Sequence, residues 1–169
     1  MVTELKPATT FWKADNKNGQ LAYCHNWKKI MNLVIDCSFI MSSILPDELQ
    51  LKIDEVYNQI SNKVYNLYVP AIFYLECNNV LISSLKKQRI NNSDYEEYLQ
   101  LLNQLPITID KFCSTAESLY SISRIATMYN LTSYGSSYLE LALRLEAKIA
   151  TLDKELVSSC RIANIESII

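Results

Sequence analysis

The chain has 169 residues, which is enough for one domain with an appended segment. Hydrophobic residues make up 49% and charged residues 20% of the sequence, as is typical of a globular protein with a sizeable core. With only 2 Gly and 4 Pro, the chain lacks the clustered glycines that P-loop and Rossmann nucleotide sites require. The net charge of −2 excludes an overall basic field for nucleic acid, although a local basic patch is compatible with it.

Residues 1–30 differ in composition from the rest of the chain. They are rich in Asn, Lys and Thr and show no hydrophobic periodicity, and Met31 stands directly before the first clean apolar run. We interpret them as an N-terminal extension, either poorly ordered or translated from a wrongly assigned start, ahead of a domain over 31–169. The alternative is an arm that docks Phe11, Trp12 and Trp27 on this domain or on a partner.

The cysteines show no C-x-x-C pair and no zinc-ligand spacing. They are Cys24, Cys37, Cys77, Cys113 and Cys160. Free thiols in a chain without a secretory signal are typical of a reducing compartment, and no apolar stretch reaches the length of a membrane span. We therefore expect a cytoplasmic protein with no membrane association.

From residue 32 onward, short apolar runs alternate with stretches of helical periodicity. The sequence predicts strands over 32–35, ending near 68–69, over 106–109 and over 148–152. It predicts helices over 46–64, from Pro70 through 85, from Asn92 or Ser93 to 105, and through 116–125, 139–145 and 156–160. Strands separated by one or two helices indicate an α/β fold with a parallel sheet covered on both faces.

Three carboxylates stand in or at the end of otherwise apolar runs, namely Asp36, Glu76 and Asp153. Such carboxylates are costly to bury unless they are paired or bind a metal. Sites in parallel sheets collect beyond the carboxyl ends of the strands, so we expect the three to converge on one rim. Together they would repel each other, and a divalent cation would relieve that repulsion. For Asp153, a role as helix N-cap is the alternative.

Three pairs of motifs form a joint signal through their order, spacing and strand–helix context. They are VIDCS (34–38) with LPDE (45–48), VPA (69–71) with ECNNVL (76–81), and YGSSYLELA (134–142) with ATLDKEL (150–156). Together they resemble the PIN domain, particularly the VapC-type toxin ribonucleases of bacterial toxin–antitoxin systems. The resemblance covers about residue 31 to the end and implies a PIN-like three-layer α/β/α fold with a central parallel sheet.

The resemblance also implies an activity and a set of site residues. The family cleaves RNA with Mg²⁺ or Mn²⁺ held by acidic side chains, and a cognate antitoxin inserts a peptide into the acidic groove. Asp36, Glu76 and Asp153 match the catalytic and metal-binding acids. The supporting positions are matched by Ser38 and Thr151, hydroxyl residues that brace those acids, and by Asn79, the polar companion of the second acid.

Gly135 occupies the position where the family has an aspartate that usually binds the metal. Its loss removes a negative charge and an oxygen ligand, which weakens Mg²⁺ binding, and Ser136 and Ser137 offer neutral oxygens only. Glu140, further along the predicted helix, is expected to point elsewhere. Two interpretations follow: a weakened VapC-like endoribonuclease toxin, or a catalytically impaired PIN domain that binds antitoxin or RNA without cutting. A generic α/β small-molecule binder is disfavoured by the absence of Gly-rich loops.

Two further expectations concern partners. Lys86, Lys87 and Arg89 form a short basic cluster after the Glu76 helix, which is either a solvated helix end or an RNA phosphate contact. The predicted helix that begins near Pro46 has more apolar side chains than one core face requires, and PIN toxins commonly pair through apolar helices. We therefore expect a two-fold homodimer.

Overall fold

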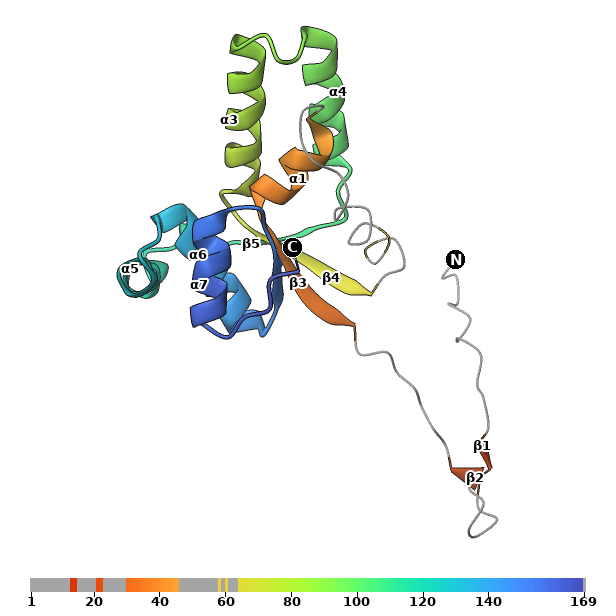
Figure 1. The fold of residues 1–169 in the computed structure, drawn as a ribbon, viewed down its shortest axis with the longest axis vertical. Helices are drawn as coiled ribbons and strands as arrows, with labels where there is room; N and C mark the ends of the chain where they lie inside the picture. The colour runs from red at the N-terminus through yellow and green to blue at the C-terminus, as the bar shows by residue number, and fades with distance from the viewer. Residues whose placement is uncertain are drawn as a thin grey trace.

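Figure 1 shows the computed structural model, which describes residues 13–14, 21–22, 30–45, 58, 60 and 64–168. Apart from residues 58, 60 and 64, the helix expected over 46–64, with the dimer contact based on it, lies outside these residues, as does nearly all of the N-terminal extension. Within the extension, β1 (Lys13–Ala14) and β2 (Leu21–Ala22) pair in antiparallel fashion.

The domain is built on one sheet of four parallel strands. They are β3 (Met31–Ile35), β4 (Tyr65–Pro70), β5 (Thr108–Asp110) and β6 (Lys148–Ala150), in the order β5-β4-β3-β6. The inner strand β3 is apolar without alternation because Leu33, Val34 and Ile35 are all buried between two layers of helices. The predicted α/β class and parallel sheet are confirmed.

Helices cover both faces of the sheet and produce three layers (Figure 1). The bounds are α1 (Cys37–Ile44), α3 (Phe73–Lys86), α4 (Asn92–Asn103), α5 (Ser118–Tyr129), α6 (Ser133–Leu145) and α7 (Lys154–Ile162), with a 3₁₀ turn η1 (Phe112–Ser114). The α3–α4 hairpin and α1 stand together, whereas α5, α6 and α7 gather on the other side, with α6 packed on β3 and β4. Among the described helices, none is both long and apolar enough to cross a lipid bilayer.

Three local details differ from the sequence prediction. Helix α1 was not predicted at all; it follows β3 after a single residue and buries Phe39 and Ile40. Pro70 ends β4 instead of opening a helix. Proline has no N–H to donate to a neighbouring strand, and the last residue of a strand tolerates this loss. Helix α3 begins at Phe73. The N-cap of α4 is Asn91, one residue earlier than expected, where it forms a capping box with Asp94 at 3.0 Å in both directions.

The strand order creates a switch point beside β3. The chain moves outward from β3 through β4 to β5 and then returns to β6 on the other side of β3. In open parallel sheets, the crevice at the carboxyl ends of such strands is where ligands bind. The Asp36 N–H donates to the Ala150 carbonyl at 3.0 Å, which aligns the residues that follow β3 and β6 at this edge.

Candidate functional site

Asp36 is the buried centre of a hydroxyl network at the end of β3. Its side chain is almost fully shielded, and Oδ2 accepts hydrogen bonds from Ser38 Oγ and from Thr151 Oγ1, the latter at 2.7 Å. Ser38 Oγ in turn accepts the backbone N–H of Leu152 at 2.9 Å. The structure thus brings the two hydroxyl residues onto the first acid, and the loop after β6 is bonded to the start of α1.

Asp153 has the helix-capping role that the sequence left open. Its Oδ1 accepts the N–H groups of Glu155 at 2.8 Å and Leu156 at 3.3 Å, so it is the N-cap of α7. Its own N–H donates to Thr151 Oγ1 at 3.0 Å, which connects it to the Asp36 network. The Asp153 side chain is exposed and also lines the groove described below.

Glu76 is held by a residue that sequence reasoning missed. It lies in the first turn of α3, and its Oε2 accepts a hydrogen bond from the hydroxyl of Tyr138, a fully buried side chain on α6. Tyr138 comes three residues after Gly135, and residues spaced this way share one helix face. That spacing within the YGSSYLELA motif is the signal that could have identified it.

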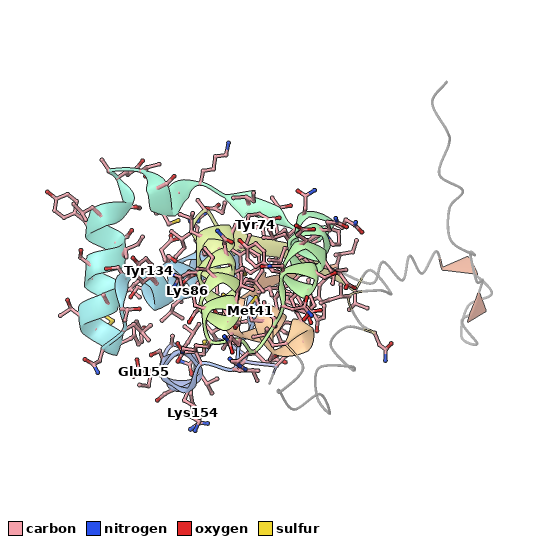
Figure 2. All side chains as sticks on the ribbon, turned by 90° about the horizontal axis from the view of Figure 1, so that it is seen from above. Met41, Tyr74, Lys86, Tyr134, Lys154 and Glu155 are labelled. Atoms are coloured by element: carbon pink, nitrogen blue, oxygen red, sulfur yellow. The ribbon has the colours of Figure 1, made fainter. Side chains whose placement is uncertain are left out.

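The three acids line one groove with a volume of about 730 Å³. Apolar side chains from α1, α3 and the adjoining loops form much of its wall, among them Met41, Leu45, Ile72, Leu75, Val80 and Leu152. Asn79, Arg89 and Tyr134 also line it, and Met41 and Tyr134 are labelled in Figure 2. The groove therefore combines carboxylates with a substantially apolar wall.

Burial dominates the electrostatics of the two shielded acids. Desolvation raises the pKa of Asp36, the hydroxyls of Ser38 and Thr151 oppose this, and the charge of Asp153 adds to it. Desolvation likewise raises the pKa of Glu76, opposed by the Tyr138 hydrogen bond and reinforced by the charge of Asp36. The acids therefore disfavour one another's charged forms when no cation is present.

Asp36→Asn should change how stability depends on pH. Because the folded-state pKa of Asp36 lies above its ordinary value of 3.8, at a pH between the two values the folded state holds a proton that the unfolded state has released. The free energy of unfolding should therefore fall as the pH rises from about 3.8 through the raised pKa. Asn at this position should remove that loss and stabilise the protein at neutral pH by about 1 kcal/mol.

Urea denaturation at a series of pH values measures this effect. Glu96→Gln, at an exposed position on α4, is the control and should leave the pH dependence unchanged. A variant Asp36→Asn that is less stable than the wild type throughout the pH range would contradict the burial argument.

Gly135 lies in the first turn of α6, next to the groove-lining Tyr134. Its N–H donates to Oγ1 of the N-cap Thr132 at 3.1 Å. A Cβ at residue 135 would meet Leu131 Cδ2 and Thr132 Oγ1 at 3.6 Å, which are ordinary van der Waals contacts. Neither the space around this residue nor its helical backbone requires glycine, so packing does not force the loss of the acid.

The carboxylates do not form a metal cluster in this arrangement. Within the described part of the chain, no group of three or more His, Cys, Asp or Glu side chains is placed to hold a metal ion. Asp36, Glu76 and Asp153 each have one oxygen engaged by a protein donor. Among the described residues the three acids therefore form no ready-made cation site, and their metal-binding and catalytic roles stay predictions.

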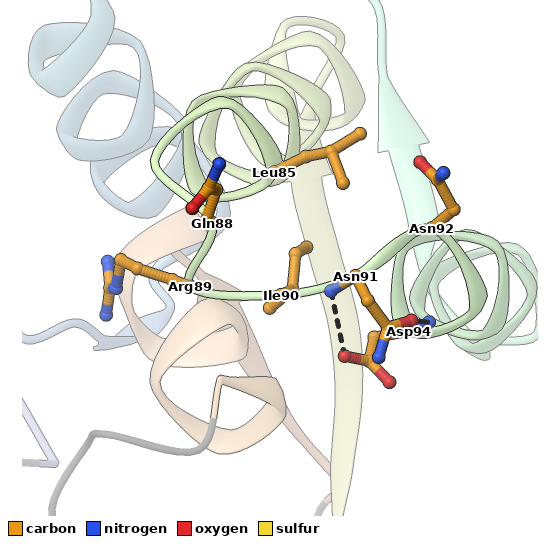
Figure 3. A pocket seen from close by; sticks show the side chains of 7 residues that line it. All are labelled: Leu85, Gln88, Arg89, Ile90, Asn91, Asn92 and Asp94. Atoms are coloured by element: carbon orange, nitrogen blue, oxygen red, sulfur yellow. Dashed lines mark hydrogen bonds between the residues drawn. The ribbon is translucent and has the colours of Figure 1, made fainter.

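The basic cluster is divided between the groove and open surface. Lys86 and Lys87 are exposed at the end of α3, and neither lines the groove. Arg89 lines the groove and also a second pocket of about 470 Å³ at the α3–α4 turn (Figure 3). Arg89 is thus the member of the cluster that shares a surface with the acids.

Glu140 belongs to a separate ion-pair network. Its Oε1 accepts Arg144 Nε at 2.9 Å, and the same guanidinium contacts both carboxylate oxygens of Asp110 at 3.1 and 2.9 Å. Arg144 also lies over the ring of Phe112, 4.9 Å from its centroid. This network joins α6 to β5 and η1, so Glu140 points away from the groove, as expected.

Two solved structures share this arrangement of strands and helices. PAE2754 from Pyrobaculum aerophilum superposes with a TM-score of 0.60 at 17% identity, over 82% of this chain and 85% of that chain. FitAcB from Neisseria gonorrhoeae superposes with a TM-score of 0.56 at 14% identity, over 80% of this chain and 95% of that chain. The domain is PIN-like. No protein-family model matches the sequence, and no curated protein is similar enough to match it.

The PIN-like fold places the groove where its topology predicts a site. Asp36 follows β3, Thr151 and Asp153 follow β6, and these strands flank the switch point of the sheet. Glu76 reaches the same groove from α3, the helix that follows the other neighbour of β3. Three segments that are distant in sequence therefore meet at one edge of the PIN-like domain.

Proposed function

We propose that this PIN-like domain is an impaired relative of the VapC-type ribonuclease toxins and that its groove chiefly binds a basic segment of a cognate antitoxin protein. The observation that supports this proposal is a groove lined by Asp36, Glu76 and Asp153, with Gly135 beside it where a fourth carboxylate would complete the set. The remaining acids provide a negative charge that attracts cations, but not a cluster that holds a metal ion.

The chemistry of the groove favours a protein segment over RNA as its main ligand. Carboxylates repel phosphate unless a cation neutralises them, so RNA is disfavoured while no metal is bound. An Arg side chain matches a carboxylate through two parallel hydrogen bonds. The apolar wall around Met41, Ile72 and Leu75 suits the apolar residues that flank such an Arg in an amphipathic segment.

A second candidate is a weak Mg²⁺- or Mn²⁺-dependent endoribonuclease. It is favoured by the presence of three acids on one groove, with Asp36 braced by Ser38 and Thr151. In that case Arg89, at the groove, and the exposed Lys86 and Lys87 would contact RNA phosphates. For both candidates we propose a cytoplasmic protein that forms a two-fold homodimer. Sedimentation of the full chain would test the homodimer.

Calorimetry with a synthetic helical peptide tests the leading candidate. The peptide has one Arg within a Leu-rich face, and the matched peptide has Gln at that position. We expect the Arg peptide to bind more tightly than the Gln peptide. The double variant Asp36→Asn, Glu76→Gln should bind the Arg peptide roughly 10–100-fold more weakly, which is the usual contribution of a charge-assisted hydrogen bond. Glu96→Gln is the matched control and should bind normally.

An RNA assay separates the two candidates. With Mn²⁺ and a structured RNA, the wild-type protein should cleave slowly or not at all. Efficient cleavage that Asp36→Asn abolishes would favour the ribonuclease over the binding protein. Equal affinity for the Arg and Gln peptides, together with no cleavage, would refute both candidates for this groove.

A further inference from the structure

Two cysteines meet beneath the acidic groove. Cys37 is the first residue of α1 and Cys77 lies in α3, and their sulfurs are hydrogen-bonded at 3.5 Å although 40 positions separate them in sequence. Both side chains are buried, Cys37 with 7% and Cys77 with 0% of its surface exposed. Each directly follows a groove acid, Cys37 after Asp36 and Cys77 after Glu76.

The pair is accessible from one side only. Cys37 lines the groove, whereas Cys77 does not line it and is fully covered, so a small oxidant meets the pair from the side of Cys37. The two remaining described cysteines lie on other elements, Cys113 in η1 and Cys160 in α7. The arrangement therefore provides one sulfur to meet an oxidant and a second to resolve the product.

We propose that Cys37 and Cys77 form a reversible disulfide that locks α1 to α3 and shifts the groove acids Asp36 and Glu76. The oxidant is hydrogen peroxide. The Cys37 sulfur attacks the peroxide, the O–O bond breaks, and sulfenic acid and water form. The Cys77 sulfur then displaces hydroxide from the sulfenic acid, and the S–S bond and a second water form. Two thiols are oxidised and one peroxide is reduced, so atoms and electrons balance.

Closing the bond moves both helices. A disulfide has a sulfur–sulfur distance of about 2.05 Å, so the sulfurs must approach from 3.5 Å. Because Asp36 and Glu76 are the chain neighbours of these cysteines, their carboxylates move with the backbone.

Peptide mapping of the full chain tests the bond. The protein is treated with hydrogen peroxide, its remaining thiols are alkylated under denaturing conditions, and it is digested without reductant. We expect a cross-linked peptide pair that contains Cys37 and Cys77 and that dithiothreitol separates. The melting temperature should rise by roughly 5–15 °C on oxidation and return on reduction, because the bond closes a long loop.

Matched variants assign the effect. Cys77→Ala should abolish the cross-link and the rise in melting temperature, whereas Cys113→Ala should retain both. Three results would overturn the proposal. Cys37 could be converted to sulfinic acid, it could be paired with a cysteine other than Cys77, or both Cys37 and Cys77 could still be alkylated after the peroxide treatment. Mapping of the wild-type protein decides this even if Cys77→Ala does not fold.

The effect on the groove rests on the proposed function and has its own readout. Affinity for the Arg peptide should fall at least several-fold on oxidation and recover with dithiothreitol, while the affinity of Cys37→Ala, which lacks the sulfur that meets the oxidant, should not change on oxidation. A cross-link that forms without any change in affinity would overturn the coupling to the groove. Failure of the reduced protein to bind the peptide would instead count against the proposed function.

Discussion

Gly135→Asp should strengthen Mn²⁺ binding by roughly 10–100-fold and should raise the rate of RNA cleavage, because it returns a hard anionic ligand to a groove that already has three carboxylates. The carboxylates of Asp36, Glu76 and Asp153 are bonded to protein donors and form no metal cluster among the described residues. A fourth carboxylate adds both an oxygen ligand and a charge that divalent binding neutralises.

The structure indicates that this substitution is tolerated. The Cβ at residue 135 meets only ordinary contacts at 3.6 Å, with Leu131 and Thr132. The residue is the third of α6, where the positive end of the helix dipole stabilises an acidic side chain. We therefore expect folding to be retained and a gain of function to be measurable.

Calorimetric titration with Mn²⁺ and cleavage of a structured RNA measure the two effects. Gly135→Asn is the matched control, because it adds the same volume without the charge and should show a much smaller gain. Gly135→Asp combined with Asp36→Asn should remain inactive in cleavage. If Gly135→Asp alters neither Mn²⁺ affinity nor cleavage, the missing acid is not what limits this protein.

Arg144→Ala should destabilise the fold by roughly 2–4 kcal/mol, since it leaves the buried Glu140 without its cation. The same guanidinium bonds Asp110 with two nitrogens and lies over Phe112, so the change also releases β5 and η1 from α6. Arg144 is partly exposed at 35%, and solvent screening keeps the expected loss below that of a fully buried pair.

Urea denaturation of three variants isolates this contribution. Arg161→Ala, at an exposed position on α7, is the control and should change the unfolding free energy by less than about 0.5 kcal/mol. The double variant Arg144→Ala, Glu140→Gln should recover part of the loss, because it removes the uncompensated charge. Equal stability of the single and double variants would show that the ion pair is not the cause.

The fold class and the set of groove acids could be predicted from the order of residues. Apolar runs such as 33–35 are continuous because β3 is buried on both faces, and a parallel sheet directs the residues after its strands to one edge. Asp36 and Asp153 could therefore be placed together from pattern alone, and the structure brings both to one groove with Glu76. Helix α1 escaped prediction because it follows β3 after one residue and its apolar run blends with the strand.

The side chains that hold the groove acids became known only from the packing of the helices on the sheet. The Tyr138–Glu76 hydrogen bond spans 62 positions, the Cys37–Cys77 contact 40 and the Arg144–Asp110 pair 34. No local periodicity encodes such pairs, because they depend on how α1, α3 and α6 pack around the sheet. Hydrophobic pattern reports which face of an element is buried, whereas the partner of a buried polar group is set by the neighbouring element that packing brings to it.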